Sequence, residues 1–232
     1  MVFKRKRKNS VDAIDNHARA HLNWQIFRIM AEFVDGFQFL SNLTKEITFF
    51  GSARTQPSSR YYREAQELAR ILGKSGYTII TGGGPGIMEA ANRGAHEVDA
   101  PSIGLNIQLP YEQRVNKYVT RGIGFYFFFT RKAMLATSAQ AYLFFPGGYG
   151  TLDELFSVLT LIQTEKMIKV PVILYGREYW DPLIEWIQNT MRIKHQAIDE
   201  IDLKLFQIVD TPKEAFKIIK KTRDQRVFNQ FV

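Results

Sequence analysis

Hydrophobic positions along the chain recur with two different spacings. Between Asn23 and Leu40 they recur at helical spacing, which predicts one amphipathic helix. Further along, short continuous apolar runs alternate with helically spaced stretches. The continuous runs predict buried strands at Glu46–Phe50, Tyr77–Thr81, Ser102–Ile107, Ala141–Phe145 and Val170–Tyr175. Helices are expected between and after these strands, the later ones near Pro182–Met191 and Pro212–Lys221.

Strands that alternate with helices are typical of a parallel sheet with helices packed on both of its faces. The sequence therefore predicts an α/β protein with a Rossmann-like, doubly wound parallel sheet, preceded by an N-terminal helix. We expect residues 23–232 to form this one domain. Residues 1–22 are expected to be a basic tail and lead-in, disordered in part.

The charge of the chain is concentrated at its start. The net charge is +8, and the run Lys4–Lys8 supplies five of these charges, which leaves +3 for the rest. Such a run is more often a solvated tail than a nucleic-acid contact, so binding of nucleic acid is not expected, although it stays open as an alternative. The chain has no cysteine, which excludes disulfides and cysteine nucleophiles and fits a reducing cytoplasm. No apolar stretch reaches about 18 residues, so no membrane span is expected.

Three glycine-containing turns follow predicted strands, at Gly51–Ala53, Gly82–Gly86 and Gly147–Gly150. In a parallel sheet these turns meet at the carboxyl edge, where the following helices offer free N–H groups to an anion. Together they indicate a phosphorylated ligand. The dinucleotide fingerprint is absent because Ile87 and Asp153 stand where its third glycine would be, and no ATP-type P-loop is present.

The most informative stretch runs from Arg131-Lys132 to Glu154. Thr151 and Glu154 have the spacing of a capping box, which alone could explain both residues but not Arg131 or the preceding glycines. A helix from Arg131 to about Ser138 descends roughly 12 Å, and the strand Ala141–Phe145 climbs back roughly 16 Å. Arg131 and Lys132 should therefore finish at the same sheet edge as Glu154.

Three segments of the chain resemble the LOG family: Thr81–Ala95, Arg131–Met134 and Phe145–Glu154, the last with its Pro-Gly-Gly-x-Gly-Thr-x-x-Glu motif. Members of this family are cytokinin riboside 5′-monophosphate phosphoribohydrolases, formerly called possible lysine decarboxylases. The resemblance covers about residues 46–191. The N-terminal helix and the segment Phe49–Arg54 resemble a longer bacterial branch, whose members often act on AMP.

The resemblance implies that Arg131 and Glu154 are catalytic. It implies that substrate is bound by Lys132, Glu112, Gly147, Gly148, Tyr149, Gly150, Thr151 and Thr160, with Gly83 and Ser52 as weaker candidates. The expected reaction is hydrolysis of the N-glycosidic bond of AMP or a cytokinin riboside 5′-monophosphate. Decarboxylation would need a lysine Schiff base and a pyridoxal site, which nothing in the sequence marks.

In this reaction a carboxylate such as Glu154 would stabilise positive charge on the ribose, while Arg131 would assist the departing base or clamp phosphate or ribose. The alternative is a non-catalytic carrier or sensor of a nucleotide or of a molybdenum-cofactor-like ligand on the same fold. We expect no cofactor and no metal, since His17 and His21 have no third ligand nearby. The aromatic run Phe125–Phe129 is expected in the core or in a homodimer contact.

Overall fold

The fold is built on one seven-stranded, fully parallel sheet. The computed structural model describes residues 10–108 and 115–222, with side chains from residue 23 onward. The strands are β1 (Glu46–Phe50), β2 (Thr78–Thr81), β3 (Ser102–Ile107), β4 (Arg121–Phe125), β5 (Ala141–Phe144), β6 (Val172–Tyr175) and β7 (Gln207–Val209). They lie in the order β4-β3-β2-β1-β5-β6-β7, and each strand pairs in parallel with its neighbours. Strands β1, β2, β3 and β5 are almost entirely buried, which explains why they appear as continuous apolar runs.

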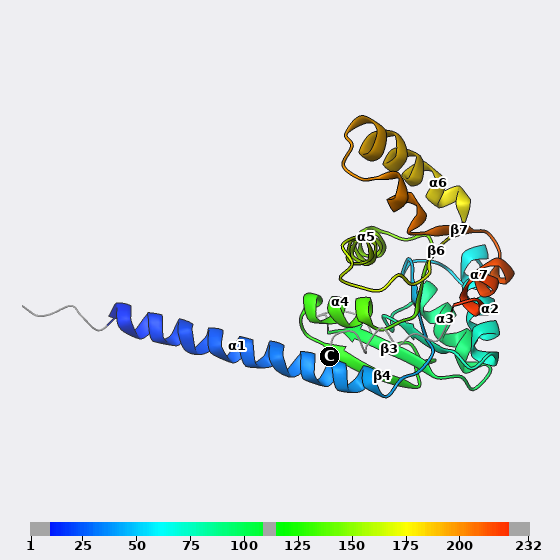
Figure 1. Cartoon of the computed structure of the whole chain (residues 1–232). Helices are drawn as coiled ribbons and strands as arrows, with labels where there is room; N and C mark the ends of the chain where they lie inside the picture. Colours follow the sequence, from blue (N-terminus) through cyan, green and yellow to red (C-terminus); the bar gives the residue numbers. More distant parts are fainter. Residues whose placement is uncertain (1–9, 109–114, 223–232) are drawn as a thin grey trace, which may run out of the picture.

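Helices cover both faces of the sheet (Figure 1). They are α1 (Ser10–Ser41), α2 (Arg60–Lys74), α3 (Ile87–His96), α4 (Phe128–Thr137), α5 (Tyr149–Gln163), α6 (Arg177–Trp186) and α7 (Pro212–Lys220). Apolar residues of α1, α4, α5 and α6 form one core cluster against the sheet, and those of α2, α3 and α7 form the other. The predicted doubly wound α/β sheet with a preceding N-terminal helix is therefore confirmed.

The order of the strands reverses next to β1. The chain moves outward from β1 through β2, β3 and β4, then crosses back so that β5 pairs with the other side of β1. Ligands of open parallel sheets bind outside the carboxyl ends of the strands at such a reversal. The turns after β1 and β5 lie at this point.

Helix α1 is longer than predicted. The helix begins at Ser10, whereas only Asn23–Leu40 was predicted. The stretch before Asn23 was missed because it contains few large apolar residues. Its C-terminal half packs on α4, where a Cβ on Gly36 would lie 2.6 Å from the sulfur of Met134. Its N-terminal half projects away from the sheet (Figure 1). Among the described residues, no helix is long and apolar enough to cross a membrane.

Two strands were not predicted. Strand β4 contains Gly122 and Gly124 and is mostly exposed, so it lacks the apolar run of a buried strand. Strand β7 has only three residues. The aromatic run that begins at Phe125 divides accordingly: Phe125 ends β4 and is buried, whereas Tyr126, Phe128 and Phe129 are exposed.

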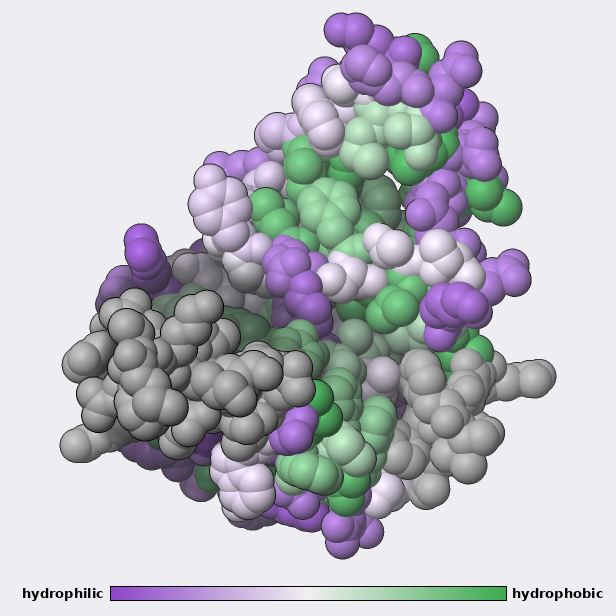
Figure 2. All heavy atoms as spheres, turned by 90° about the vertical axis from the view of Figure 1, so that its left-hand side faces the viewer, coloured by the Kyte–Doolittle hydropathy of each residue, from purple (hydrophilic) through white to green (hydrophobic). Residues whose placement is uncertain are grey.

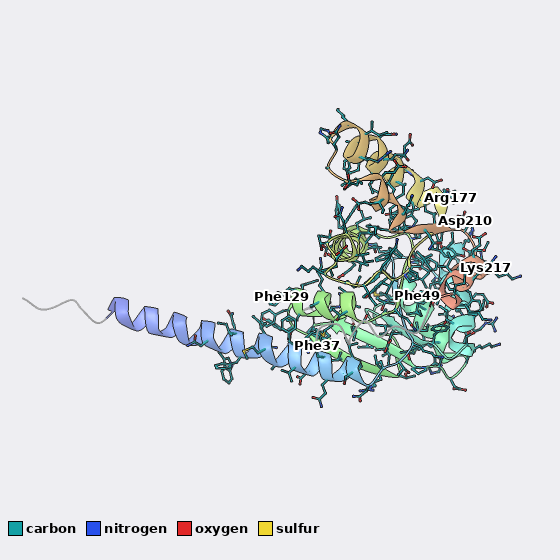
Figure 3. The ribbon with its side chains drawn as sticks, viewed as in Figure 1. Phe37, Phe49, Phe129, Arg177, Asp210 and Lys217 are labelled. Carbon is teal, nitrogen blue, oxygen red and sulfur yellow. The ribbon has the colours of Figure 1, made fainter. Side chains whose placement is uncertain are left out.

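Helix α6 begins earlier than the predicted start at Pro182. Gly176, which has a φ of 96°, directly follows β6 and is the N-cap of α6, so the helix begins at Arg177. The backbone N–H of Arg177 donates to Asp210 Oδ1 at 2.8 Å, and its Nε lies 3.6 Å from Asp210 Oδ2 (Figure 3). The helix continues into a π-helical segment, Ile187–Lys194.

Candidate active site

The three glycine turns meet as predicted. The backbone N–H of Ser52, after β1, donates to the Pro146 carbonyl after β5 at 3.0 Å, and the Ile87 N–H donates to the Ser52 carbonyl at 3.1 Å. Gly86 has a φ of 69°, and a Cβ there would lie 2.2 Å from the Ser52 carbonyl oxygen. The turns after β1, β2 and β5 are thus packed directly on one another.

The glycines before α5 have different roles. A Cβ on Gly147 would lie 2.1 Å from Thr151 Oγ1, so the packing of the chain itself requires glycine there. A Cβ on Gly148 or Gly150 would meet nothing within 4 Å, and neither glycine has a positive φ. The chain therefore imposes no steric need for glycine at these two positions. Their small size leaves room for another molecule to approach the backbone.

Helix α5 starts with uncapped amide groups. Its N-cap is Gly148, which has no side chain to accept from them, and Tyr149 and Gly150 are its first two residues. The N–H groups in the first turn of a helix have no carbonyl partner within that helix, and together with the helix dipole they attract anions. The Tyr149 side chain is 94% exposed. The turn is held from α6, where the Tyr179 hydroxyl donates to the Gly147 carbonyl at 2.6 Å.

Glu154 lies in the second turn of α5, so the capping-box interpretation of Thr151 and Glu154 is wrong. A capping box needs its first residue at the N-cap, a position that Gly148 occupies instead. The Glu154 side chain is buried, and its Oε2 atom has no hydrogen-bond partner among the residues that the structure describes. Burial raises the pKa of Glu154 to about 7, although the charges of Lys132 and Arg131 act to lower this pKa.

Arg131 enters the same edge from α4. Its Nε donates to the Leu105 carbonyl of β3 at 2.7 Å. A Cβ on Gly82 would lie 2.2 Å from its Nη2 atom, so Gly82 leaves space for the guanidinium. Burial lowers the pKa of Arg131, and the charge of Glu154 acts to raise this pKa. The two predicted catalytic residues are therefore near enough to interact electrostatically.

Lys132 bridges α4 and α5. Its Nζ lies 2.5 Å from Asp153 Oδ2 and donates to Ser157 Oγ at 3.0 Å. Because Asp153 is largely exposed, this ion pair adds little to stability. The position of Lys132 matters more: it holds a positive charge beside the Glu154 carboxyl.

The start of α4 is fixed from α1. Glu32 accepts hydrogen bonds from the backbone N–H groups of Tyr126 at 2.7 Å and Phe127 at 3.3 Å. It also accepts one from the Thr130 hydroxyl at 2.6 Å. Phe127 is the N-cap of α4 and has no capping side chain of its own. The N-terminal helix thus anchors the turn that leads into the helix that carries Arg131.

The other predicted residues divide into three groups. Ser52 and Gly83 lie at the edge: Ser52 Oγ accepts from the Arg54 N–H at 3.1 Å, and Gly83 has a φ of 73°. Thr160 is exposed and donates to the Phe156 carbonyl at 2.7 Å. Because Thr160 is six residues beyond Glu154, it lies on a different side of α5 and about 9 Å further along its axis. Glu112 lies outside the described residues.

Two residues at the edge were not among the predicted site residues, although Gly82 belongs to the predicted turn Gly82–Gly86. Gly82 accommodates the Arg131 guanidinium. Asn106 stands near the end of β3 with a buried side chain whose Oδ1 atom has no hydrogen-bond partner in residues 10–108 and 115–222. A polar residue inside the otherwise apolar segment Ile103–Ile107 was the signal that could have identified Asn106.

A cavity of about 470 Å³ lies at the opposite, amino edge of the sheet. Its lining includes Thr78, His96, Asp99 and Arg121. Among the described residues that line it, none has a buried side-chain atom without a partner. The unpartnered groups of the carboxyl edge therefore make that edge the better candidate for chemistry.

Comparison with known proteins agrees with the motifs of this edge. A family model described as "Possible lysine decarboxylase" matches residues 88–219, which include α4 and α5. A rice protein (Oryza sativa subsp. japonica) named a probable cytokinin riboside 5′-monophosphate phosphoribohydrolase is 30% identical over 157 residues. The match covers 65% of this chain and 62% of the rice protein, less than two thirds of its length. A cytokinin riboside 5′-monophosphate phosphoribohydrolase of Rhodococcoides fascians is 26% identical over 62% of this chain and 75% of its own.

Solved structures with the same fold include a molybdenum cofactor carrier protein of Chlamydomonas reinhardtii. It aligns with a TM-score of 0.56 and 21% identity over 77% of this chain and 97% of its own. At this identity the likeness concerns the fold. The family match spans more than half of the chain. The chain therefore belongs to the family of that model, the LOG family.

Proposed function

We propose that this protein hydrolyses the N-glycosidic bond of a nucleoside 5′-monophosphate and releases the free base and ribose 5-phosphate. The observation that carries the proposal is the buried Glu154 carboxyl. Its Oε2 atom lacks a partner within the described part of the chain, while the charges of Lys132 and Arg131 act on it. Burial of an unpartnered carboxylate costs free energy, so the presence of such a group favours a catalytic role over a structural one. The relatives named phosphoribohydrolases support the same class of reaction.

The substrate would be held by its phosphate at the start of α5. The N–H groups of Tyr149 and Gly150 point out of the helix with no carbonyl acceptor in it, and Gly148 and Gly150 leave the approach open. Glu154, which is five residues after Tyr149, would lie beside the ribose. Because of this anion site, we expect a preference for a phosphorylated substrate over the nucleoside without phosphate.

Cleavage of the bond between C1′ and the base leaves positive charge on the ribose ring in an oxocarbenium-like transition state. The ionised Glu154 carboxylate would stabilise that charge and accept a proton from the water whose oxygen attacks C1′. The electron pair of the broken bond leaves with the base. Arg131 would stabilise the developing negative charge there, and the base finally takes up a proton.

The experiment is incubation of the purified chain with each common nucleoside 5′-monophosphate, followed by chromatography for free base and ribose 5-phosphate. We expect release from at least AMP, a much lower rate with adenosine, and loss of most turnover in Glu154→Gln. Tight binding of a nucleotide without release of any base would contradict the proposal and favour a carrier instead. Equal rates with AMP and adenosine would contradict the phosphate site.

We also propose that the chain functions as a homodimer, with α1 and the start of α4 in the contact. Figure 2 views the side on which α1 projects and shows hydrophobic residues reaching the surface there. Large exposed apolar side chains of α1 and of the turn into α4 are Trp24, Phe27, Met30, Val34, Tyr126, Phe128 and Phe129. Exposed apolar groups of this kind mark association surfaces. Light scattering should give twice the mass of 26.8 kDa, and a monomer would contradict the proposal.

A further inference from the structure

A network of buried side-chain hydrogen bonds lies beneath the turn that follows β2. Its centre is Asn92 of α3, which is fully buried. Asn92 Oδ1 accepts from the Thr81 hydroxyl at 2.6 Å and from Asn116 Nδ2 at 2.9 Å. Asn92 Nδ2 donates to Ser102 Oγ at 2.9 Å and to the Ile103 carbonyl at 3.3 Å. This one side chain therefore joins the end of β2 to β3 and to the segment that leads into β4.

The same network holds the backbone of the turn. The Thr81 hydroxyl accepts from the Gly83 N–H at 2.9 Å. The backbone N–H of Asn116 donates to the Gly83 carbonyl at 2.8 Å. Asn116 Nδ2 donates to the carbonyls of Gly83 at 3.2 Å and of Gly84 at 3.0 Å. Both polar backbone groups of Gly83 are thus bonded, which leaves the turn little freedom to move.

The guanidinium of Arg131 packs against this turn. A Cβ on Gly82 would lie 2.2 Å from Arg131 Nη2, so the guanidinium lies directly against the Gly82 backbone. On its other side, Arg131 Nε donates to the Leu105 carbonyl of β3 at 2.7 Å. The guanidinium is therefore supported by the turn after β2 and by β3. These are two of the elements that Asn92 joins.

The position of the guanidinium matters because its charge would act on the departing base. In the proposed reaction, negative charge develops on the base only as the bond to C1′ breaks. Arg131 would therefore stabilise the transition state more than the bound substrate. A displacement of about 1 Å can lower the rate of such a step about a hundredfold. Residues that fix the guanidinium should thus affect kcat far more than KM.

We propose that Thr81, Asn92 and Asn116 are positioning residues for Arg131. They fix the turn after β2 relative to β3, so that the guanidinium is held in the orientation that hydrolysis needs. Thr81 and Asn92 are fully buried, so they act through Arg131 rather than on the substrate. This inference rests on the proposed function, since it identifies further residues that the same reaction requires.

The test compares Thr81→Val with Thr81→Ser, each assayed with AMP well below its melting temperature. Valine has the shape of threonine but neither accepts from the Gly83 N–H nor donates to Asn92, whereas serine keeps the hydroxyl. We expect Thr81→Val to lower kcat about ten- to hundredfold while KM changes by less than about threefold. Thr81→Ser should restore most of the lost turnover.

Two further variants separate positioning from stability. Asn116 is only half-buried, so Asn116→Ala should fold, and it should lower kcat in the same way. Thr120→Val is the control. The Thr120 hydroxyl also makes two hydrogen bonds, with the backbone N–H and carbonyl of Ser102, but it lies at the amino edge of the sheet. Its loss should lower the melting temperature and leave kcat unchanged.

Crystal structures of Thr81→Val and Asn116→Ala distinguish failure of this inference from failure of the proposed function. We expect the Arg131 guanidinium to be displaced from Gly82 and from the Leu105 carbonyl by about 1 Å or more. That displacement supports the positioning role even if the wild type releases no base, in which case only the proposed function fails. A guanidinium that stays in place overturns the inference alone. An unchanged kcat in Thr81→Val, or an equal loss in Thr120→Val, also overturns it.

Discussion

Arg131 and Glu154 influence each other's ionisation without forming an ion pair. The negative charge of Glu154 acts to raise the pKa of Arg131, and the positive charge of Arg131 acts to lower the pKa of Glu154. In the part of the chain that the structure describes, Arg131 Nε instead donates to the Leu105 carbonyl, and Glu154 Oε2 is unpartnered. In a direct salt bridge each of the two charges would be compensated by the other. Their separation leaves each free to act on a third group.

Glu154→Gln should make the protein more stable at neutral pH while it removes activity. The pKa of Glu154 is raised from 4.5 to about 7 by burial, so the folded state holds this proton more tightly than the unfolded chain. That stabilisation is complete below pH 4.5 and is lost as the pH rises to about 7. The advantage of glutamine should therefore grow over this interval, to on the order of 1–3 kcal/mol, and stay level above it. Urea unfolding of both proteins across this pH range measures it. A difference that does not depend on pH would contradict the burial of an ionisable group here.

The pH dependence of hydrolysis should report the same carboxyl. If ionised Glu154 accepts the proton of water, kcat/KM for AMP should rise with pH through about 7. The phosphate of AMP also titrates near pH 6, so a control is needed. In Lys132→Met the largest charge that lowers the Glu154 pKa is gone. The rise should then move to higher pH, whereas titration of the substrate would not move. An unshifted profile would exclude Glu154 as its origin.

Gly147→Ala and Gly150→Ala form a matched pair. A Cβ at position 147 would collide with the Thr151 side chain, so the first variant should be destabilised by about 1–3 kcal/mol. A Cβ at position 150 meets nothing within 4 Å and lies in a helix, so the second should be as stable as the wild type or more stable, by up to about 1 kcal/mol. If phosphate binds against this backbone, Gly150→Ala should nevertheless raise KM for AMP about tenfold or more. Thermal melting and steady-state kinetics separate the two effects, and an unchanged KM would move the phosphate elsewhere.

Glu32→Gln should reduce turnover although Glu32 lies on the N-terminal helix. Loss of its charge weakens three hydrogen bonds at the start of α4, which carries Arg131. We expect a loss of about 1–2 kcal/mol in stability and a lower kcat. Asp35→Asn, an exposed position one turn along the same helix, is the control and should change neither. Full activity in Glu32→Gln would show that α4 is positioned without these hydrogen bonds.

The sequence was sufficient for five of the seven strands, because buried strands such as β1 and β5 leave continuous apolar runs. The sequence also predicted that Arg131 and Glu154 lie at the carboxyl edge of the sheet, because the direction of the chain in a parallel sheet determines where each turn lies. The edge strand β4 was missed because its glycines and exposed positions leave no such run. The capping box was wrong because the spacing of Thr151 and Glu154 does not reveal which residue starts the helix. That Asn106 Oδ1 lacks a partner among the described residues depends on its surroundings in the fold, which the sequence does not show.

The most direct test of the central claim is a crystal structure of Glu154→Gln with AMP. We predict that the phosphate lies at hydrogen-bonding distance from the N–H groups of Tyr149 and Gly150. C1′ of the ribose should lie beside residue 154, and the Arg131 guanidinium on the far side of the scissile bond. AMP bound at the amino edge of the sheet, or at the carboxyl edge with C1′ remote from residue 154, would contradict it.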